Sequence, residues 1–332
     1  MRRPLACSAV PRSISSAAAD PGRGAPAVIA ADGGDKGGEE RRRLGVAWRI
    51  LLWIGLLFVF FLPGQYAVSL LPRSPLGWAS YLVLSAVGLL AGWAVLTRVD
   101  GRPPGALGFA LSRDAVKETL SGLGLGAGLI ALSALLLLVT GAVAFVSDEG
   151  SALGYVASLG WTLLFFWLAA AYEEIWFRGY GFQALVEGVG PWPAAIVTSG
   201  LFSLLHGLNP NFGPAAFINI FLAGVMLAMA YLRTRSLWFA TALHAGWNWS
   251  MASLFAFPVS GLTLIDTPMY DAVERGSDWW TGGAFGPEAG VVGTLVLAAG
   301  IWLLVRGPLP RESAHMRRLV PIVDGRLPER WP

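Results

Sequence analysis

Apolar residues run in long blocks through most of the chain, and short polar segments separate the blocks. Eight blocks come near the ~20 residues that an α-helix needs to cross the hydrocarbon of a bilayer. They lie at residues 47–71, 76–97, 119–146, 157–185, 191–208, 213–232, 236–257 and 288–306. Within the third block, SGLGLGAG (121–128) favours close helix–helix packing. We therefore expect an all-α fold, a polytopic transmembrane helical bundle with about eight spans.

The same pattern divides the chain into six regions. Residues 1–43 are small, polar and rich in Gly and Pro, so they bury too little apolar surface to fold, and we expect a disordered N-terminal tail. N-terminal transmembrane helices follow at 44–150, and a transmembrane core follows at 151–257. The remaining regions are an extracytoplasmic loop at 258–287, a last transmembrane helix at 288–306 and a cytoplasmic tail at 307–332.

Lys and Arg in the short connections predict the orientation, because positive residues favour the cytoplasmic side. They cluster before the first block and after the second, sixth and eighth, whereas the loops on the other side carry mainly Asp and Glu. Both termini are therefore expected in the cytoplasm, which an even number of spans satisfies. The clustered residues are Arg41, Arg42, Arg43, Arg49, Arg98, Arg102, Arg113, Lys117, Arg233, Arg235, Arg306, Arg311, Arg317 and Arg318.

The composition indicates a membrane protein and excludes several function classes. Only 14% of the 332 residues are charged, whereas soluble domains average about 25%. The single cysteine, Cys7, excludes a disulfide framework and a multi-cysteine metal site. A formal charge of +3 without a basic, aromatic-rich stripe argues against a nucleic-acid partner. The abundance of Ala, Gly and Arg indicates a bacterial source, so we expect a multi-pass protein of the bacterial inner membrane, surrounded by the lipid bilayer.

Two glutamates and an arginine interrupt the fourth block, in the sequence AYEEIWFRGY (171–180). A charged side chain at bilayer depth costs ~2.5–3.5 kcal/mol on insertion scales, so three together need a reason. Glu174 and Arg178 are four residues apart and share a helix face as an ion pair, whereas Glu173 is turned about 100° away. One interpretation is a buried carboxylate held ready for chemistry. The other is a helix-end charge cluster in the headgroup region.

Two of the three histidines, His206 and His244, also fall inside apolar blocks. His244 and Asn248 are four residues apart and share a helix face, and Phe202 precedes His206 by one turn. A lone intramembrane histidine more often serves helix packing. Clustering with Glu173 would instead let each polar group satisfy another and avoid several separate desolvation penalties. We therefore predict that these side chains gather in one site.

The predicted cluster suits hydrolysis. A glutamate in a dry site can take a proton from water, and a histidine can share that proton. A second histidine and an asparagine amide can donate hydrogen bonds to an oxyanion. The same residues could instead hold zinc, because Glu173, His206 and His244 make a plausible three-ligand open site. The HExxH pattern of soluble zinc proteases is absent from the sequence. Both uses of the cluster stay open, and the expected cofactor is either none or zinc.

Three motifs carry a resemblance to a known family. EEIWFR, FSLLH and HAGWN occur in this order on three separate apolar blocks, within residues 157–257. They resemble the EExxxR, FxxxH and HxxxN motifs of the CPBP family, which comprises the CAAX prenyl endopeptidases and the bacteriocin-processing or Abi proteins. The resemblance implies a membrane-embedded endopeptidase, glutamate- or metal-dependent, that cleaves a peptide or membrane-protein substrate.

The resemblance also implies a role for each motif residue. Glu173 would activate water together with His206, and His244 and Asn248 would form the oxyanion hole. Three further residues would support the site: Glu174 and Arg178 by organising it, and Phe202 by walling one side with its ring.

Two other functions compete with this interpretation. The first is a non-catalytic scaffold or bacteriocin immunity-type protein of the same fold, although such a protein has no need to keep the whole Glu/His/His/Asn set. The second is a proton-coupled transporter, which often shows two matching halves, and the sequence has no such internal symmetry. A prenylated substrate is not expected, because prokaryotes generally lack prenylated CAAX proteins.

Overall fold

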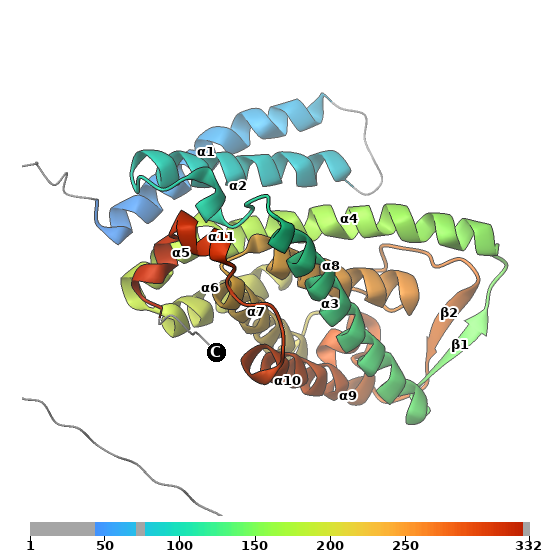
Figure 1. Cartoon of the computed structure of the whole chain (residues 1–332). Coiled ribbons are helices and arrows are strands. Elements are labelled where there is room, and N and C mark those ends of the chain that lie inside the picture. Colours follow the sequence, from blue (N-terminus) through green and yellow to red (C-terminus); the bar gives the residue numbers. More distant parts are fainter. Residues whose placement is uncertain (1–43, 71–76, 328–332) are drawn as a thin grey trace, which may run out of the picture. The chain divides into compact units, whose positions relative to one another are not determined.

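The computed structural model describes residues 44–70 and 77–327, and the tail predicted at 1–43 lies outside these residues. Most of the described chain is helical (Figure 1). The helices are α1 (Val46–Ser69), α2 (Trp78–Arg98), α3 (Arg113–Val139), α4 (Ala152–Arg178), α5 (Tyr180–Val189), α6 (Pro191–His206), α7 (Pro214–Thr234), α8 (Leu237–Trp249), α9 (Asp278–Thr281), α10 (Val291–Arg306) and α11 (Ala314–Leu319). α8 continues into a π-helical turn at Ser250–Leu254.

Local sequence signals fix where the long helices begin. The side chains of Ser112 and Ser151 each accept a hydrogen bond from a backbone N–H three residues later, at the starts of α3 and α4. Such caps satisfy N–H groups that have no partner within the helix. Pro191 and Pro214 open α6 and α7, where the missing N–H of proline leaves no hydrogen bond unmade.

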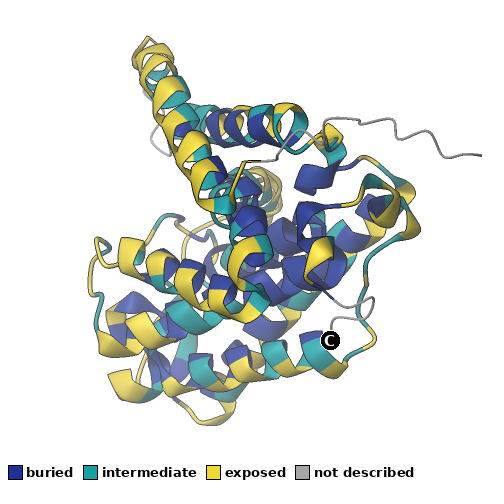
Figure 2. Cartoon of the chain, turned by 90° about the vertical axis from the view of Figure 1, so that its left-hand side faces the viewer, coloured by how far each residue is buried: buried dark blue, intermediate teal, exposed yellow. Residues whose placement is uncertain are grey.

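Five helical stretches are long and apolar enough to cross a membrane, namely α1, α2, α3, the stretch Ala152–Val189 that α4 and α5 form, and α7. Large apolar side chains cover the outside of these helices, and Figure 2 shows exposed residues along outer faces and buried residues along inner ones. On α1, for example, Trp48 is 67% exposed and Phe58 is 66% exposed. Glu174 and Arg178 are fully buried. Apolar residues outside and charged residues inside are typical of a protein surrounded by lipid.

Helices occupy the predicted apolar blocks, with three differences. The third block predicts a helix to residue 146, but α3 ends at Val139 and a strand follows. The fourth block is divided at Gly179, between α4 and α5. α6, α8 and α10 have 16, 13 and 16 residues, fewer than a full span needs. The number of eight spans and the cytoplasmic position of both termini therefore stay predictions.

A two-stranded antiparallel sheet departs from the predicted all-α fold. Strand β1 (Val143–Ser147) pairs with β2 (Tyr270–Glu274), with Val143 opposite Glu274. The hydroxyl of Tyr155, in the first turn of α4, hydrogen-bonds to that of Tyr270 at 2.9 Å. The sheet thereby ties the α3–α4 connection to the region predicted as an extracytoplasmic loop, residues 258–287.

The region predicted as a tail, 307–332, is packed against the bundle as far as residue 327. Arg233 donates hydrogen bonds to four backbone carbonyls, that of Leu304 in the last turn of α10 and those of Gly307, Leu309 and Pro310 after it. Arg235 binds Asp324 at 3.0 Å, and Val323 is fully buried. The end of α7 is therefore anchored from the C-terminal side.

α3 and α8 meet at their backbones, as the glycine-rich stretch 121–128 predicted. A Cβ atom placed on Gly122 would lie 2.5 Å from the carbonyl oxygen of Phe239, and one on Gly126 would lie 2.3 Å from that of Leu243. Gly246 makes the reverse contact from α8. Small residues at such positions let two helices approach closely where no hydrophobic force drives them together. The predicted close packing is thus confirmed, and it fixes α8, the helix that carries His244 and Asn248.

This contact predicts a difference between two glycines of the same helix. Gly126→Ala should destabilise the protein by ~1–3 kcal/mol, because the added methyl group meets backbone atoms that have no room to move. Gly124 has no other heavy atom within 4 Å of an added Cβ, so Gly124→Ala should leave the stability unchanged or slightly raised. Thermal unfolding of both variants in detergent tests the contact, and equal melting temperatures would contradict it.

Candidate active site

Glu174 lies at the centre of the polar cluster, on α4, and is fully buried. Its Oε1 atom accepts two hydrogen bonds, from Arg178 Nη1 at 3.0 Å and from His244 Nδ1 at 2.9 Å. The ion pair expected from the spacing is therefore present, and α8 adds a histidine to it. Both partners of the pair are fully buried inside the protein, so the pair is not a charge cluster on its surface.

Arg178 joins α4 to two further helices. Its Nη2 atom donates a hydrogen bond to the carbonyl oxygen of Gly224 on α7, at 2.9 Å. Its guanidinium carbon lies 4.8 Å from the ring centre of Phe202 on α6, a distance at which a cation is attracted to an aromatic face. Phe202 thus supports the arginine rather than serving only as an inert wall.

The hydrogen bond to Glu174 determines which nitrogen of His244 carries a proton. A carboxylate that is paired with an arginine only accepts, so His244 Nδ1 is the donor. The other nitrogen, Nε2, lies 3.8 Å from Oε2 of Glu173. His244 is therefore held between two carboxylates, bonded to one and close to the other.

Glu173 has a different environment from its neighbour, because it lines a cavity of about 270 Å³. The side chain is 25% exposed, while its Oε2 atom is buried and has no hydrogen-bond partner among the described residues. Aromatic residues make up much of the cavity wall: Tyr81, Phe165, Phe166, Tyr172, Phe177 and Phe202. A carboxylate in such surroundings can accept a proton from a bound water molecule.

His206 and Asn248 line the same cavity as Glu173. His206 is the last residue of α6, and its Nδ1 lies 2.8 Å from the carbonyl oxygen of Phe202. A carbonyl oxygen only accepts, so Nδ1 donates this bond and the lone pair of the neutral ring is on Nε2. Three of the four predicted catalytic residues, Glu173, His206 and Asn248, thus line the same cavity.

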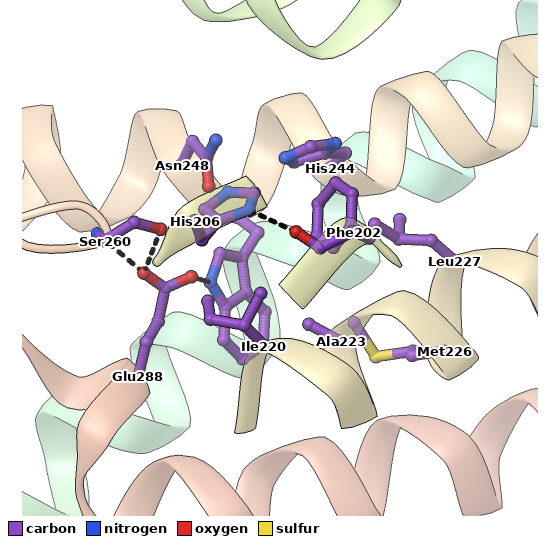
Figure 3. Close-up of a pocket in the computed structure, with 11 residues that line it drawn as sticks. Phe202, His206, Ile220, Ala223, Met226, Leu227, His244, Asn248, Ser260 and Glu288 are labelled. Carbon is purple, nitrogen blue, oxygen red and sulfur yellow. Dashed lines mark hydrogen bonds between the residues drawn. The ribbon is translucent and has the colours of Figure 1, made fainter. Parts of the chain in front are cut away.

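His244, the fourth, meets His206 and Asn248 in a second cavity of about 20 Å³ (Figure 3). Ser260 and Glu288 also line this cavity, and in Figure 3 they lie on one side of it while Phe202 and Leu227 lie on the other. Ser260 and Glu288 are not among the site residues that the sequence predicts. Glu288 could have been found by the criterion that found the other glutamates, because GPEAG (286–290) places one carboxylate at the start of an apolar block.

The residues predicted as possible zinc ligands are Glu173, His206 and His244. Among residues 44–70 and 77–327, no three His, Cys, Asp or Glu side chains are arranged to hold a metal ion. The Nδ1 atoms of His206 and His244 are both engaged, by Phe202 and Glu174 respectively. These bonds leave the Nε2 atoms of both neutral rings available, so zinc held by Glu173, His206 and His244 stays a prediction.

The apolar helices and the buried polar cluster define the class of this protein. It is a multi-pass membrane protein with polar side chains gathered inside its helical bundle. Residues 155–250 match the family model of the Rce1-like proteins, described as type II CAAX prenyl endopeptidases. The match confirms the resemblance to the CPBP family over this segment, which contains every residue predicted for the site. The comparison with individual curated proteins gave no match.

The buried ion pair predicts an asymmetric effect of mutation on stability. Arg178→Met should cost ~3–5 kcal/mol, because it leaves Glu174 charged and buried without its partner. Combining it with Glu174→Gln removes both charges while keeping an acceptor for His244, so the double variant should be more stable than Arg178→Met alone. The folded fraction in detergent, measured by gel filtration and thermal unfolding, tests this order. A stable but inactive Arg178→Met protein would instead indicate that the arginine acts on the substrate.

Proposed function

We propose that this protein is an intramembrane endopeptidase in which Glu173 activates the water molecule that cleaves a peptide bond. The unequal environments of the two adjacent glutamates carry the proposal. Glu174 is fully buried and bound to Arg178 and His244, whereas Glu173 reaches a cavity shared with His206 and Asn248. The Rce1-like match over residues 155–250 supports the same activity.

Proton transfer begins the proposed reaction. Glu173 takes a proton from water while Nε2 of His206 accepts a hydrogen bond from the second O–H group, so the water oxygen attacks the peptide carbonyl carbon. When the C–N bond of the tetrahedral intermediate breaks, protonated Glu173 gives its proton to the leaving amine. The carboxylate is thereby restored, and the products are a carboxylic acid and an amine.

Charge on the carbonyl oxygen is stabilised from α8. The Asn248 amide can donate one hydrogen bond, and His244 can donate another from Nε2 when its ring is doubly protonated. Glu174 and Glu173 lie on either side of that ring, at 2.9 Å and 3.8 Å, so the imidazolium has two counter-charges. Glu174 and Arg178 therefore act on the reaction through His244.

The cavity indicates the kind of substrate. Its walls are mainly aromatic and aliphatic, and the helices around it are apolar on their outer faces. A peptide segment within or beside the bilayer meets such surroundings at little desolvation cost. We therefore propose a membrane-protein or membrane-associated peptide substrate, cleaved in the bacterial inner membrane in a CAAX-protease-like or bacteriocin-processing-like reaction.

The decisive experiment identifies the substrate and tests the base together. Membranes from cells with the wild-type protein are compared with membranes that carry Glu173→Gln, and new peptide N-termini present only with the wild type give the cleaved sequence. Glu173→Gln should abolish cleavage without loss of folded protein, because the amide keeps shape but accepts no proton. A quenched fluorescent peptide of the cleaved sequence then gives rates for the purified protein.

The rates of further variants should follow a fixed order. His206→Ala should be nearly as severe as Glu173→Gln, because the water loses its second partner. Asn248→Ala should retain activity reduced by ~10²–10³, as for the loss of one oxyanion donor. An active Glu173→Gln with an inactive Glu174→Gln would move the base to Glu174. Identical membranes from wild type and variant would favour the non-catalytic scaffold or the transporter.

Metal dependence is tested separately. The proposed chemistry uses side chains alone, so the purified protein should contain far less zinc than protein and keep its activity after treatment with a chelator. Asn248→Ala, which removes no proposed zinc ligand, serves as the control. Stoichiometric zinc that is lost in both His206→Ala and His244→Ala but kept in Asn248→Ala would establish the zinc site and overturn the metal-free reaction.

A further inference from the structure

Residues 259–262 form a tight turn beside the site. Val259 and Leu262 exchange two backbone hydrogen bonds, each 2.9 Å long. The two residues between them, Ser260 and Gly261, have φ angles of +48° and +82°, as the central positions of a type I′ turn require. Serine lacks the freedom of glycine to adopt a positive φ. Contacts must therefore hold Ser260 in this conformation.

Every polar group of Ser260 has a partner. Its backbone N–H and its hydroxyl both donate to Oε2 of Glu288, at 2.7 Å and 2.8 Å. Its carbonyl oxygen accepts a hydrogen bond from Asn209 Nδ2 at 2.9 Å. Gly261 N–H donates to the carbonyl oxygen of Phe285 at 2.8 Å. The turn is thus fixed by its surroundings as well as by its own two hydrogen bonds.

Glu288 connects this turn to α8. Its other carboxylate oxygen, Oε1, accepts a hydrogen bond from the indole N–H of Trp247 at 2.9 Å, and the residue is only 4% exposed. Trp247 immediately precedes Asn248. All three groups that reach Glu288 are donors, so a carboxylate satisfies them and a carboxamide does not, because its NH₂ group would face a donor.

The turn forms part of the cavity that Glu173 lines. Val259, Ser260 and Leu262 all contribute to this wall, and Ser260 and Glu288 also line the smaller cavity with both histidines. A peptide that fills this cavity beside Glu173 would lie against the turn. These residues lie outside the segment 155–250 that matches the Rce1-like family.

We propose that Glu288 is a positioning residue, which holds the turn Val259–Leu262 as a wall of the substrate cavity and thereby determines which peptide side chains fit beside Glu173. The proposal rests on the proposed protease function. Glu288 acts on binding, since it touches the turn and Trp247 but not the reacting atoms. Without the Glu288 carboxylate, the turn spends part of its time in other conformations. The apparent affinity for substrate then falls in proportion to the fraction of molecules that keep the binding conformation.

The kinetic test compares two Glu→Gln variants in the same region. Glu288→Gln should raise KM for the cleaved peptide about tenfold and leave kcat within about threefold. Glu274→Gln is the matched control, because Glu274 accepts a hydrogen bond from Gly283 N–H at 3.1 Å but does not bind Ser260. A lower kcat with unchanged KM would place Glu288 in the chemical step and overturn the positioning role.

A second readout does not depend on cleavage. In a Cys7→Ser protein, Leu262→Cys places a single thiol on the turn, and its rate of reaction with N-ethylmaleimide reports how well the turn is held. Adding Glu288→Gln should raise this rate several-fold, whereas adding Glu274→Gln should not. Unchanged labelling and unchanged KM would overturn the proposal. An active Glu173→Gln protein would instead refute the proposed base, and the labelling result would still stand.

A milder variant covers the case in which Glu288→Gln fails to fold. Ser260→Ala removes the hydroxyl donor to Glu288 but keeps the backbone N–H. It should raise KM and the labelling rate in the same direction by a smaller factor. If neither changes in Ser260→Ala, the contact between Glu288 and the turn does not position the wall.

Discussion

A fully buried arginine is the constraint on which the site depends. Arg178 needs a counter-charge and hydrogen-bond acceptors inside the bundle, because its desolvation is costly and solvent is out of reach. Glu174 on its own helix supplies the charge, a carbonyl of α7 accepts one N–H group, and the ring of Phe202 on α6 covers the guanidinium. His244 on α8 then binds the same carboxylate. One cation therefore joins four helices in surroundings where apolar contact alone gives little preference for one arrangement.

This arrangement separates the two adjacent glutamates without any difference in their chemistry. Consecutive residues of an α-helix point about 100° apart, so one carboxylate meets the arginine and the other meets the cavity. The buried member, Glu174, binds His244, and the cavity member, Glu173, is the base of the proposed reaction. A chain that needs one structural and one reactive carboxylate can thus obtain both from a single dipeptide.

The sequence predicted what depends on spacing along one helix, and it did not predict what depends on contacts between distant segments. The pair of Glu174 with Arg178 and the shared helix face of His244 and Asn248 follow from the four-residue period. Glu288 has no periodic partner, and its ligands Trp247 and Ser260 come from other parts of the chain, so their convergence exists only in the folded protein. The third apolar block predicts a helix to residue 146, but its end forms the strand Val143–Ser147, since an apolar run of Val, Ala and Phe fits a helix and a strand alike.

The backbone contact between α3 and α8 bears on how a substrate gains access. At Gly122 and Gly126, backbone atoms of α8 occupy the place of a side chain, so α8 has little room to shift against α3 at this contact. α8, with His244 and Asn248, is then the stationary side of the cavity. Tyr81 of α2 and Tyr172 of α4 also line the cavity, and rotation of their rings about single bonds would widen it. Such an opening would admit a peptide while His244 and Asn248, the proposed oxyanion donors, stay in place.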